Sequence, residues 1–204
     1  MKLYTHPLSS NARRVDLLVS HLELELEREI VDLRAGVQRS PEYRALNPNG
    51  KVPMLVDGDF VLWESNAILT YLAAITPDAN LLGGSPRERA NIERWLFWQS
   101  NHLGRTADVL FFECGLKKLF GLGDPDEALV AQHLERFEAE GAVLNDQLDG
   151  QDFVCGELSV ADFSLLTSVE LVFAAGADVA AFPNIMAWFA RCQALPGYIA
   201  PPSA

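Results

Sequence analysis

The sequence predicts an α/β domain with the order βαβ, a short helix and ββα, followed by an all-α helical bundle domain. Short strand-like and helix-like segments alternate before position 77. Residues 77–86 are dense in Pro, Gly, Asn and Ser, which is typical of a linker. Only helical patterns follow. We therefore expect the α/β domain at residues 1–76, the linker at 77–86 and the all-helical domain at 87–204.

The first three elements are predicted to form a βαβ unit. Residues 2–5 have the composition of a short strand. Apolar residues at helical spacing come next, at Val15, Leu18, Val19 and Leu22. Apolar and charged residues then alternate as in a half-buried strand, with Leu24, Leu26 and Ile30 as the apolar positions. Two strands joined through a helix are expected to be parallel, with a right-handed crossover.

The rest of the first domain is predicted to be a short helix and a ββα unit. Ser40, Pro41 and Glu42 form a favourable helix start. Residues 53–56 and 60–62 flank a Gly-containing turn, so they predict a β-hairpin. One helical stripe closes the domain, with Ile68, Leu69, Leu72 and Ile75 on it.

The second domain contains two sequences typical of helix N-termini. Ser85 is followed by Pro86 and Glu88, and Ser159 is followed by Asp162, so both serines are expected to begin capping boxes. Further helices are predicted from apolar spacing around Ile92–Leu96, Leu129–Phe137 and Ile185–Cys192. These patterns predict a bundle of helices without strands.

Composition excludes several classes of protein. The 204 residues are 49% hydrophobic, unlike a disordered chain, and the net charge of −12 argues against nucleic acid as a partner. No run approaches a membrane span, and the N-terminus lacks the pattern of a secretory signal. Cys114, Cys155 and Cys192 match neither a disulfide framework nor a metal site. We expect a protein of the reducing cytoplasm that binds neither a metal nor a membrane.

Four segments, in this order and at this spacing, resemble the cytosolic glutathione transferases: Pro7–Val15, Asn47–Pro53, Trp63–Ile68 and Ser159–Asp162. The resemblance is to serine-type members, such as theta-like, phi-like and nu-like bacterial proteins. It implies a thioredoxin-like first domain, a homodimer, and glutathione as a co-substrate without a prosthetic group.

The resemblance also implies where the peptide backbone of glutathione docks. In similar proteins the peptide bond before the proline that corresponds to Pro53 is cis. The resemblance therefore implies that the N–H and C=O of Val52 pair with glutathione as an added strand would. Glu64 and Ser65 stand at a predicted helix N-terminus, which favours a carboxylate such as that of the γ-glutamyl group. The alternatives are a plain loop-to-strand turn at Pro53 and a simple helix cap at Glu64–Ser65.

The segment between the first strand and the first helix is expected to hold the group that activates the thiol. Similar transferases have a serine here, which corresponds to Ser9, and nu-like members also use an asparagine, which corresponds to Asn11. Ser10 is the alternative to Ser9, because the match between this segment and the serine of similar transferases can be off by one residue. A hydroxyl that donates to the sulfur would stabilise the thiolate without acting as a base or a nucleophile. The alternative is a Ser9 that only caps the helix.

Two further sets of residues complete the predicted site. Gln38, Arg39 and Lys51 are candidates for binding the glycine carboxylate, although many relatives have a histidine in place of Gln38. The pocket for the electrophile is expected between the two domains. Its candidate residues are Leu8, Asn101, His102, Arg105 and Phe112.

Three functions are compatible with the sequence. The leading one is conjugation of glutathione to a small hydrophobic electrophile. The second is glutathione-dependent reduction of a disulfide or a peroxide, which the Ser9 and Asn11 pair favours. The third is an interaction module without turnover, which a failure to bind a glutathione-affinity column would indicate.

Overall fold

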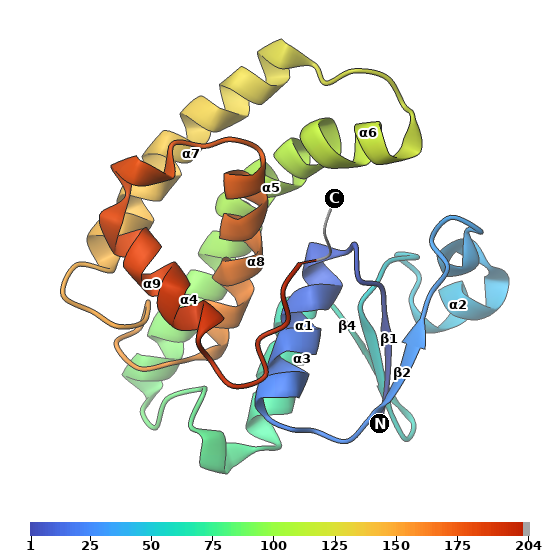
Figure 1. Cartoon of the computed structure of the whole chain (residues 1–204). Helices are drawn as coiled ribbons and strands as arrows, with labels where there is room; N and C mark the ends of the chain where they lie inside the picture. The colour runs from blue at the N-terminus through green and yellow to red at the C-terminus, as the bar shows by residue number, and fades with distance from the viewer. Residues whose placement is uncertain (202–204) are drawn as a thin grey trace. The chain divides into compact units, whose positions relative to one another are not determined.

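The computed structural model describes residues 1–201, which form two compact units (Figure 1). The first unit comprises Met1–Leu81 and the tail from Leu195, and the second comprises Leu82–Ala194. The division after Leu81 lies within the segment 77–86. The tail corrects the predicted range of 87–204 for the helical domain. It belongs to the first unit because the guanidinium of Arg13 donates to the carbonyl of Ile199, and Gly197 packs against the backbone of Ser20.

A four-stranded sheet is the centre of the first unit. Its strands are β1 (Lys2–Thr5), β2 (Glu27–Ile30), β3 (Met54–Asp57) and β4 (Phe60–Trp63), in the order β2-β1-β3-β4. The predicted parallel pairing of the first two strands is confirmed. The predicted hairpin is confirmed as well, and Gly58 in its turn has a φ of 61°.

Three helices complete this unit, together with the short turns η1 (Val37–Arg39) and η2 (Pro77–Ala79). In Figure 1, α1 (Ser10–His21) and α3 (Ser65–Ala74) lie on one side of the sheet, and α2 (Pro41–Leu46) lies on the other. The predicted start of α2 is confirmed, because Ser40 Oγ accepts from the N–H of Tyr43 at 3.1 Å. The order βαβ, short helix, ββα is therefore confirmed.

Two apolar positions are more exposed than predicted. Ile30 is 60% exposed, and the next residue, Val31, is 1% exposed and packs with Tyr43 and Met54. The strand β2 is an edge strand that begins only at Glu27, so the alternation through Leu24, Leu26 and Ile30 does not follow one strand face. Ile75 is 45% exposed and is the C-cap residue just after the end of α3 at Ala74.

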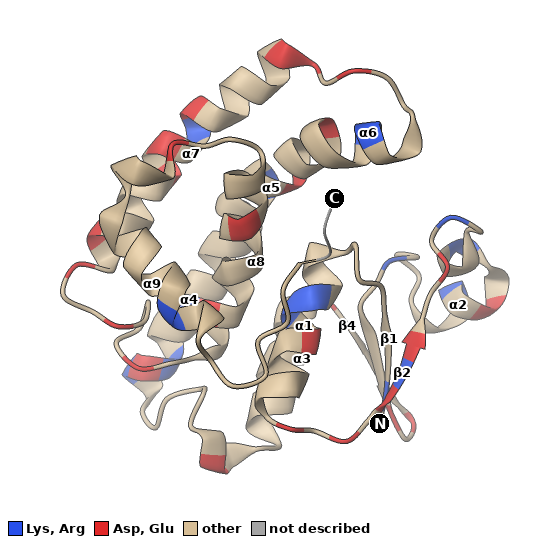
Figure 2. Ribbon diagram, in the orientation of Figure 1, with Lys and Arg blue, Asp and Glu red and all other residues tan. Residues whose placement is uncertain are grey.

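The second unit is helical, as predicted. Its elements are α4 (Pro86–Asn101), α5 (Leu103–Phe111), the π-helical segment η3 (Phe112–Leu116), α6 (Lys117–Phe120), α7 (Glu127–Gln147), α8 (Val160–Ala174), η4 (Val179–Ala181) and α9 (Pro183–Gln193). The helices α4 and α5 are separated only by His102, whose φ of −121° and ψ of −94° are not helical. Figure 2 marks several acidic residues along α7, which contribute to the net negative charge.

Both predicted capping boxes are present, but in very different surroundings. At the start of α4, Glu88 accepts from the N–H of Ser85 at 2.8 Å in an exposed position. At the start of α8, Asp162 is 1% exposed and accepts four hydrogen bonds. Its donors are Val154 N–H, Ser159 N–H, Ser159 Oγ and Trp188 Nε1, at 2.9 to 3.1 Å. Burial raises the pKa of Asp162, and these donors oppose the rise.

The described part of the chain contains neither a membrane-spanning helix nor a cluster of metal-binding side chains. No helix within residues 1–201 is long and apolar enough to cross a membrane. Nor do those residues contain a group of three or more His, Cys, Asp or Glu placed to hold a metal ion.

Candidate active site

The register of the sheet places three of the predicted segments at the same end of its strands. Tyr4 of β1 pairs with Met54 of β3, and Met54 pairs with Trp63 of β4. The turn after β1, the residues just before β3 and the residues just after β4 therefore leave the sheet at the same end. These are the segments that contain Ser9, Val52 and Ser65.

Ser9 is the N-cap of α1. Its Oγ accepts from the N–H of Ala12 at 3.2 Å, and its own N–H donates to the carbonyl of His6 at 3.0 Å. The capping role considered for Ser9 is thus present in the structure. It does not compete with thiolate binding, because a hydroxyl that accepts a hydrogen bond keeps its own proton for donation. Ser10 is the first residue of α1.

The N-termini of α1 and α3 are joined by a side-chain hydrogen bond. Ser65 Oγ donates to Asn11 Oδ1 at 3.3 Å, and Ser65 is 7% exposed. Glu64, just before α3, has a φ of 74° and a ψ of 113°, a backbone conformation that is rare for a residue with a side chain. Glu64 makes no side-chain hydrogen bond to the helix N-terminus. The two helix ends together favour negative charge at this edge of the sheet.

The segment before β3 is held by side chains from the region of α2. The Val52–Pro53 peptide bond is cis. The carbonyl of Lys51 accepts from Tyr43 Oη and from Asn47 Nδ2, both at 2.8 Å. Burial raises the pKa of Tyr43 to about 12, so its hydroxyl remains a donor. Within residues 1–201 the N–H and C=O of Val52 make no hydrogen bond, and these groups are therefore available to pair with a bound peptide.

The candidates for the glycine carboxylate lie on two segments: Lys51 is just before β3, and Gln38 and Arg39 are on η1. Gln38 Nε2 donates to the carbonyl of Leu33 at 3.4 Å, and its Oε1 is buried without a hydrogen-bond partner among the described residues. Arg39 and Lys51 are exposed. The Gln38 amide nitrogen has a second hydrogen, which can donate to a carboxylate. The role of all three residues stays a prediction.

The residues predicted to line the electrophile pocket fall on both units. Leu8 lies in the turn before α1, and the other four lie around the break between α4 and α5 and at the start of η3. The amide of Asn101 donates back to the carbonyl of Phe97 at 2.9 Å, and His102 stacks on Trp98. Arg105 and Phe112 are exposed. The pocket itself stays a prediction.

The second unit has an open pocket of about 500 Å³ on its surface, and none of the predicted site residues lines it. It is lined by Arg94, Trp95, Trp98, Val143, Asp146 and Gln147.

Three residues of the site were missed by the sequence reasoning. Tyr43 and Asn47 fix the carbonyl before Val52, and the ring of His6 accepts from the N–H of Leu8. Asn47 lies in one of the four segments that carry the family resemblance, which was a usable signal. For Tyr43 and His6 no signal was present, because their roles depend on contacts that spacing does not reveal.

The fold and the site together define a class of protein. A mixed four-stranded sheet with this order of elements, followed by a helical unit, is a thioredoxin-like domain joined to a helical domain. The family model described as the N-terminal domain of glutathione S-transferase matches residues 1–74. The model for the C-terminal domain of the same family matches residues 127–191.

Relatives and solved structures agree with this result. The chain is 35% identical to "Glutathione S-transferase 3" of Zea mays, covering 97% of this chain and 91% of the relative. It is 33% identical to "Glutathione S-transferase D7" of Drosophila melanogaster, covering 97% and 87%. A glutathione S-transferase-I structure bound with lactoylglutathione superposes with a TM-score of 0.87, at 27% identity over 96% of this chain and 95% of that one. The chain belongs to the glutathione S-transferase family.

Proposed function

We propose that this protein is a glutathione transferase that joins the thiolate of glutathione to a small hydrophobic electrophile. The proposal depends mainly on one observation: three segments leave the sheet at the same end. They contain Ser9, Ser65, and Val52 with its unpaired peptide N–H and C=O. These groups match the needs of a γ-glutamyl tripeptide. Val52 pairs with its cysteinyl backbone, and the N-terminus of α3 at Ser65 receives its γ-glutamyl carboxylate.

The remaining contacts follow from the charges of glutathione. Glu64 pairs with the γ-glutamyl amino group, and Gln38, Arg39 and Lys51 receive the glycine carboxylate. Local cations are needed here because glutathione is an anion and the protein carries a net charge of −12. The electrophile enters the predicted pocket of Leu8, Asn101, His102, Arg105 and Phe112.

The chemical task of the site is to ionise the thiol. A free thiol has a pKa of about 8.5, so only about 3% is thiolate at pH 7. Lowering that pKa by two units requires about 2.7 kcal/mol of preferential stabilisation of the anion. The Ser9 hydroxyl and the N-terminus of α1 supply this through a charge-assisted hydrogen bond and the helix dipole.

The experiment that tests the proposal is a pH–rate series on Ser9→Ala. We expect the apparent pKa of enzyme-bound glutathione to rise by about one to two units, since each unit corresponds to about 1.4 kcal/mol. Turnover at pH 7 should fall, while affinity for glutathione changes little because the peptide is bound elsewhere. Ser9→Thr is the matched control, because it retains the hydroxyl and the helix cap.

The same pH–rate series is measured for Ser10→Ala and Asn11→Ala. Each variant is assayed with a chlorinated aromatic electrophile and with hydroxyethyl disulfide. If Ser10→Ala shifts the thiol pKa and Ser9→Ala does not, Ser10 is the donor. If only Asn11→Ala changes the rate, and disulfide reduction exceeds conjugation, the reductase function replaces the transferase function. If no variant shifts the thiol pKa, the side-chain mechanism is wrong.

We also propose that the protein is a homodimer of the cytoplasm. Phe60 and Trp63 are exposed on the edge strand β4 of the first unit, and Phe97 on α4 of the second unit is 67% exposed. Apolar side chains on an unpaired edge and on a helix face favour burial in a two-fold interface. Free cysteines are consistent with a reducing compartment.

Light scattering at micromolar concentration should give roughly twice 22.5 kDa. We expect Phe97→Ser to shift the mass toward that of one chain, because it removes an apolar contact from the interface. Leu119→Ser is the control, since Leu119 is another exposed apolar residue of the same unit, on α6. A stable wild-type monomer would contradict the proposal.

A further inference from the structure

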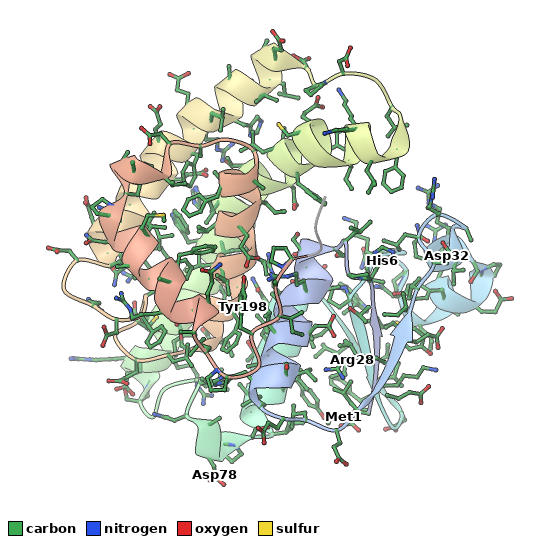
Figure 3. The ribbon with its side chains drawn as sticks, in the orientation of Figure 1. Met1, His6, Arg28, Asp32, Asp78 and Tyr198 are labelled. Carbon is green, nitrogen blue, oxygen red and sulfur yellow. The ribbon has the colours of Figure 1, made fainter. Side chains whose placement is uncertain are left out.

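His6 holds both amide groups of the turn that leads to Ser9. Its Nδ1 accepts from the N–H of Leu8 at 3.2 Å, and its carbonyl accepts from the N–H of Ser9 at 3.0 Å. Pro7, between them, has no N–H. The first two donors of the turn therefore both bond to one residue. Figure 3 labels this residue at the end of β1.

The contact to Leu8 has the geometry of an Asx-turn, in which a side-chain acceptor binds the backbone N–H two residues further along. An imidazole can be the acceptor of this hydrogen bond only when Nδ1 has a lone pair, so the ring must be neutral with its proton on Nε2. A protonated ring has an N–H at both nitrogens. It would face the N–H of Leu8 with a second donor, and the hydrogen bond would be lost.

The surroundings of the ring favour its neutral form. Burial lowers the pKa of His6 below its usual value near 6.5. Asp32, from the segment after β2, opposes this shift through its negative charge. Figure 3 labels Asp32 as well. The net effect is a lowered pKa, so the ring is neutral at pH 7 and becomes protonated only in more acidic solution.

We propose that His6 is a positioning residue for the transferase reaction, whose neutral ring fixes the turn that presents the Ser9 hydroxyl to the thiolate. This inference rests on the proposed role of Ser9. His6 does not touch the reacting atoms in this scheme; it acts by fixing where α1 begins. Protonation of the ring releases the N–H of Leu8 and loosens the turn.

The kinetic consequence is a second ionisation on the acidic side of the pH profile. At saturating glutathione, kcat/KM for the electrophile depends on one ionisation of the bound thiol, which gives a slope of about one in its logarithm. If His6 must also be neutral, the slope steepens to about two at the acidic end, below the lowered pKa of His6.

Two isosteric variants test the geometry. His6→Asn places an acceptor oxygen near the position of Nδ1 and cannot titrate, so the rate at pH 7 should be retained and the slope should stay near one. His6→Gln places its amide near the position of Nε2 instead. We expect it to lose about five- to ten-fold in kcat at pH 7, the equivalent of one hydrogen bond, with a smaller change in KM for glutathione. His133→Gln, on α7, is the control histidine and should leave the wild-type profile unchanged.

An independent measurement needs no turnover. Ring-nitrogen chemical shifts of the protein without glutathione should show the proton of His6 on Nε2, and the Leu8 amide signal should titrate together with the ring. Either a proton on Nδ1 or a Leu8 amide that ignores the titration would overturn the inference, as would equal kcat values for His6→Asn and His6→Gln. An unchanged thiol pKa in Ser9→Ala would instead overturn the proposed role of Ser9, and it would leave the tautomer of His6 and the titration of the Leu8 amide as expected, so the two failures are distinguishable.

Discussion

Replacing Asp162 by alanine is expected to lower the free energy of unfolding by about 3–5 kcal/mol, because each buried hydrogen-bond donor left without an acceptor costs about 1–3 kcal/mol. The four donors that Asp162 accepts from would be left without an acceptor. Val154 and Trp188 are fully buried, and Ser159 is 2% exposed, so water cannot easily replace the carboxylate. Urea unfolding followed by circular dichroism measures this loss.

The exposed capping box provides a matched control. Glu88 occupies the same position relative to Ser85 at the start of α4, but its carboxylate is accessible to solvent. Glu88→Ala should therefore lower the free energy of unfolding much less than Asp162→Ala does, because water can replace the exposed carboxylate. Asp162→Asn keeps the volume of the side chain and one acceptor oxygen, so we expect a loss between those of the two alanine variants. Equal losses for Asp162→Ala and Glu88→Ala would show that burial of the network does not matter.

Replacing Ser65 by alanine should weaken glutathione binding about 10- to 150-fold. This corresponds to about 1.5–3 kcal/mol for one hydrogen bond to a charged group. In the structure the Ser65 hydroxyl donates to Asn11 over 3.3 Å, a long hydrogen bond. The carboxylate of glutathione is a stronger acceptor than a side-chain amide, so we expect the hydroxyl to exchange its partner on binding. Calorimetric titration measures the change in affinity.

Ser10→Ala is the control for this measurement. Ser10 is also the first residue of a helix, at the start of α1, but it has no predicted part in holding the γ-glutamyl group. Its substitution should leave the affinity within a few-fold of the wild type, as is usual for a change away from such contacts. If Ser65→Ala binds glutathione as tightly as the wild type, the assignment of the γ-glutamyl carboxylate to the N-terminus of α3 is wrong.

Local sequence determined most of the secondary structure. The helix starts at Ser40, Ser85 and Ser159 depend on a side chain and a backbone group within a few residues of each other, so a short window contains all the information. The hairpin around Gly58 is local in the same way. The order of these elements, together with the four family-like segments, was enough to predict the fold class and to nominate Ser9, Val52 and Ser65.

The tertiary structure decided what depends on partners distant in the chain. The sequence could not show that the tail from Leu195 joins the first unit, because Arg13 and Ile199 are 186 positions apart. Nor could it show that β2 is an edge strand that leaves Ile30 exposed, since exposure depends on which neighbours cover a strand.

The same distinction holds for the candidate site. Spacing nominated Asn11 and Ser65 separately, and only the packing of α1 against α3 brought their side chains together. Tyr43 gained its place beside Lys51 from the position of α2 relative to β3. His6 contacts a residue only two positions away, yet it was missed. Whether an imidazole turns back to its own chain depends on the burial and the charge around the ring, and the fold alone sets both.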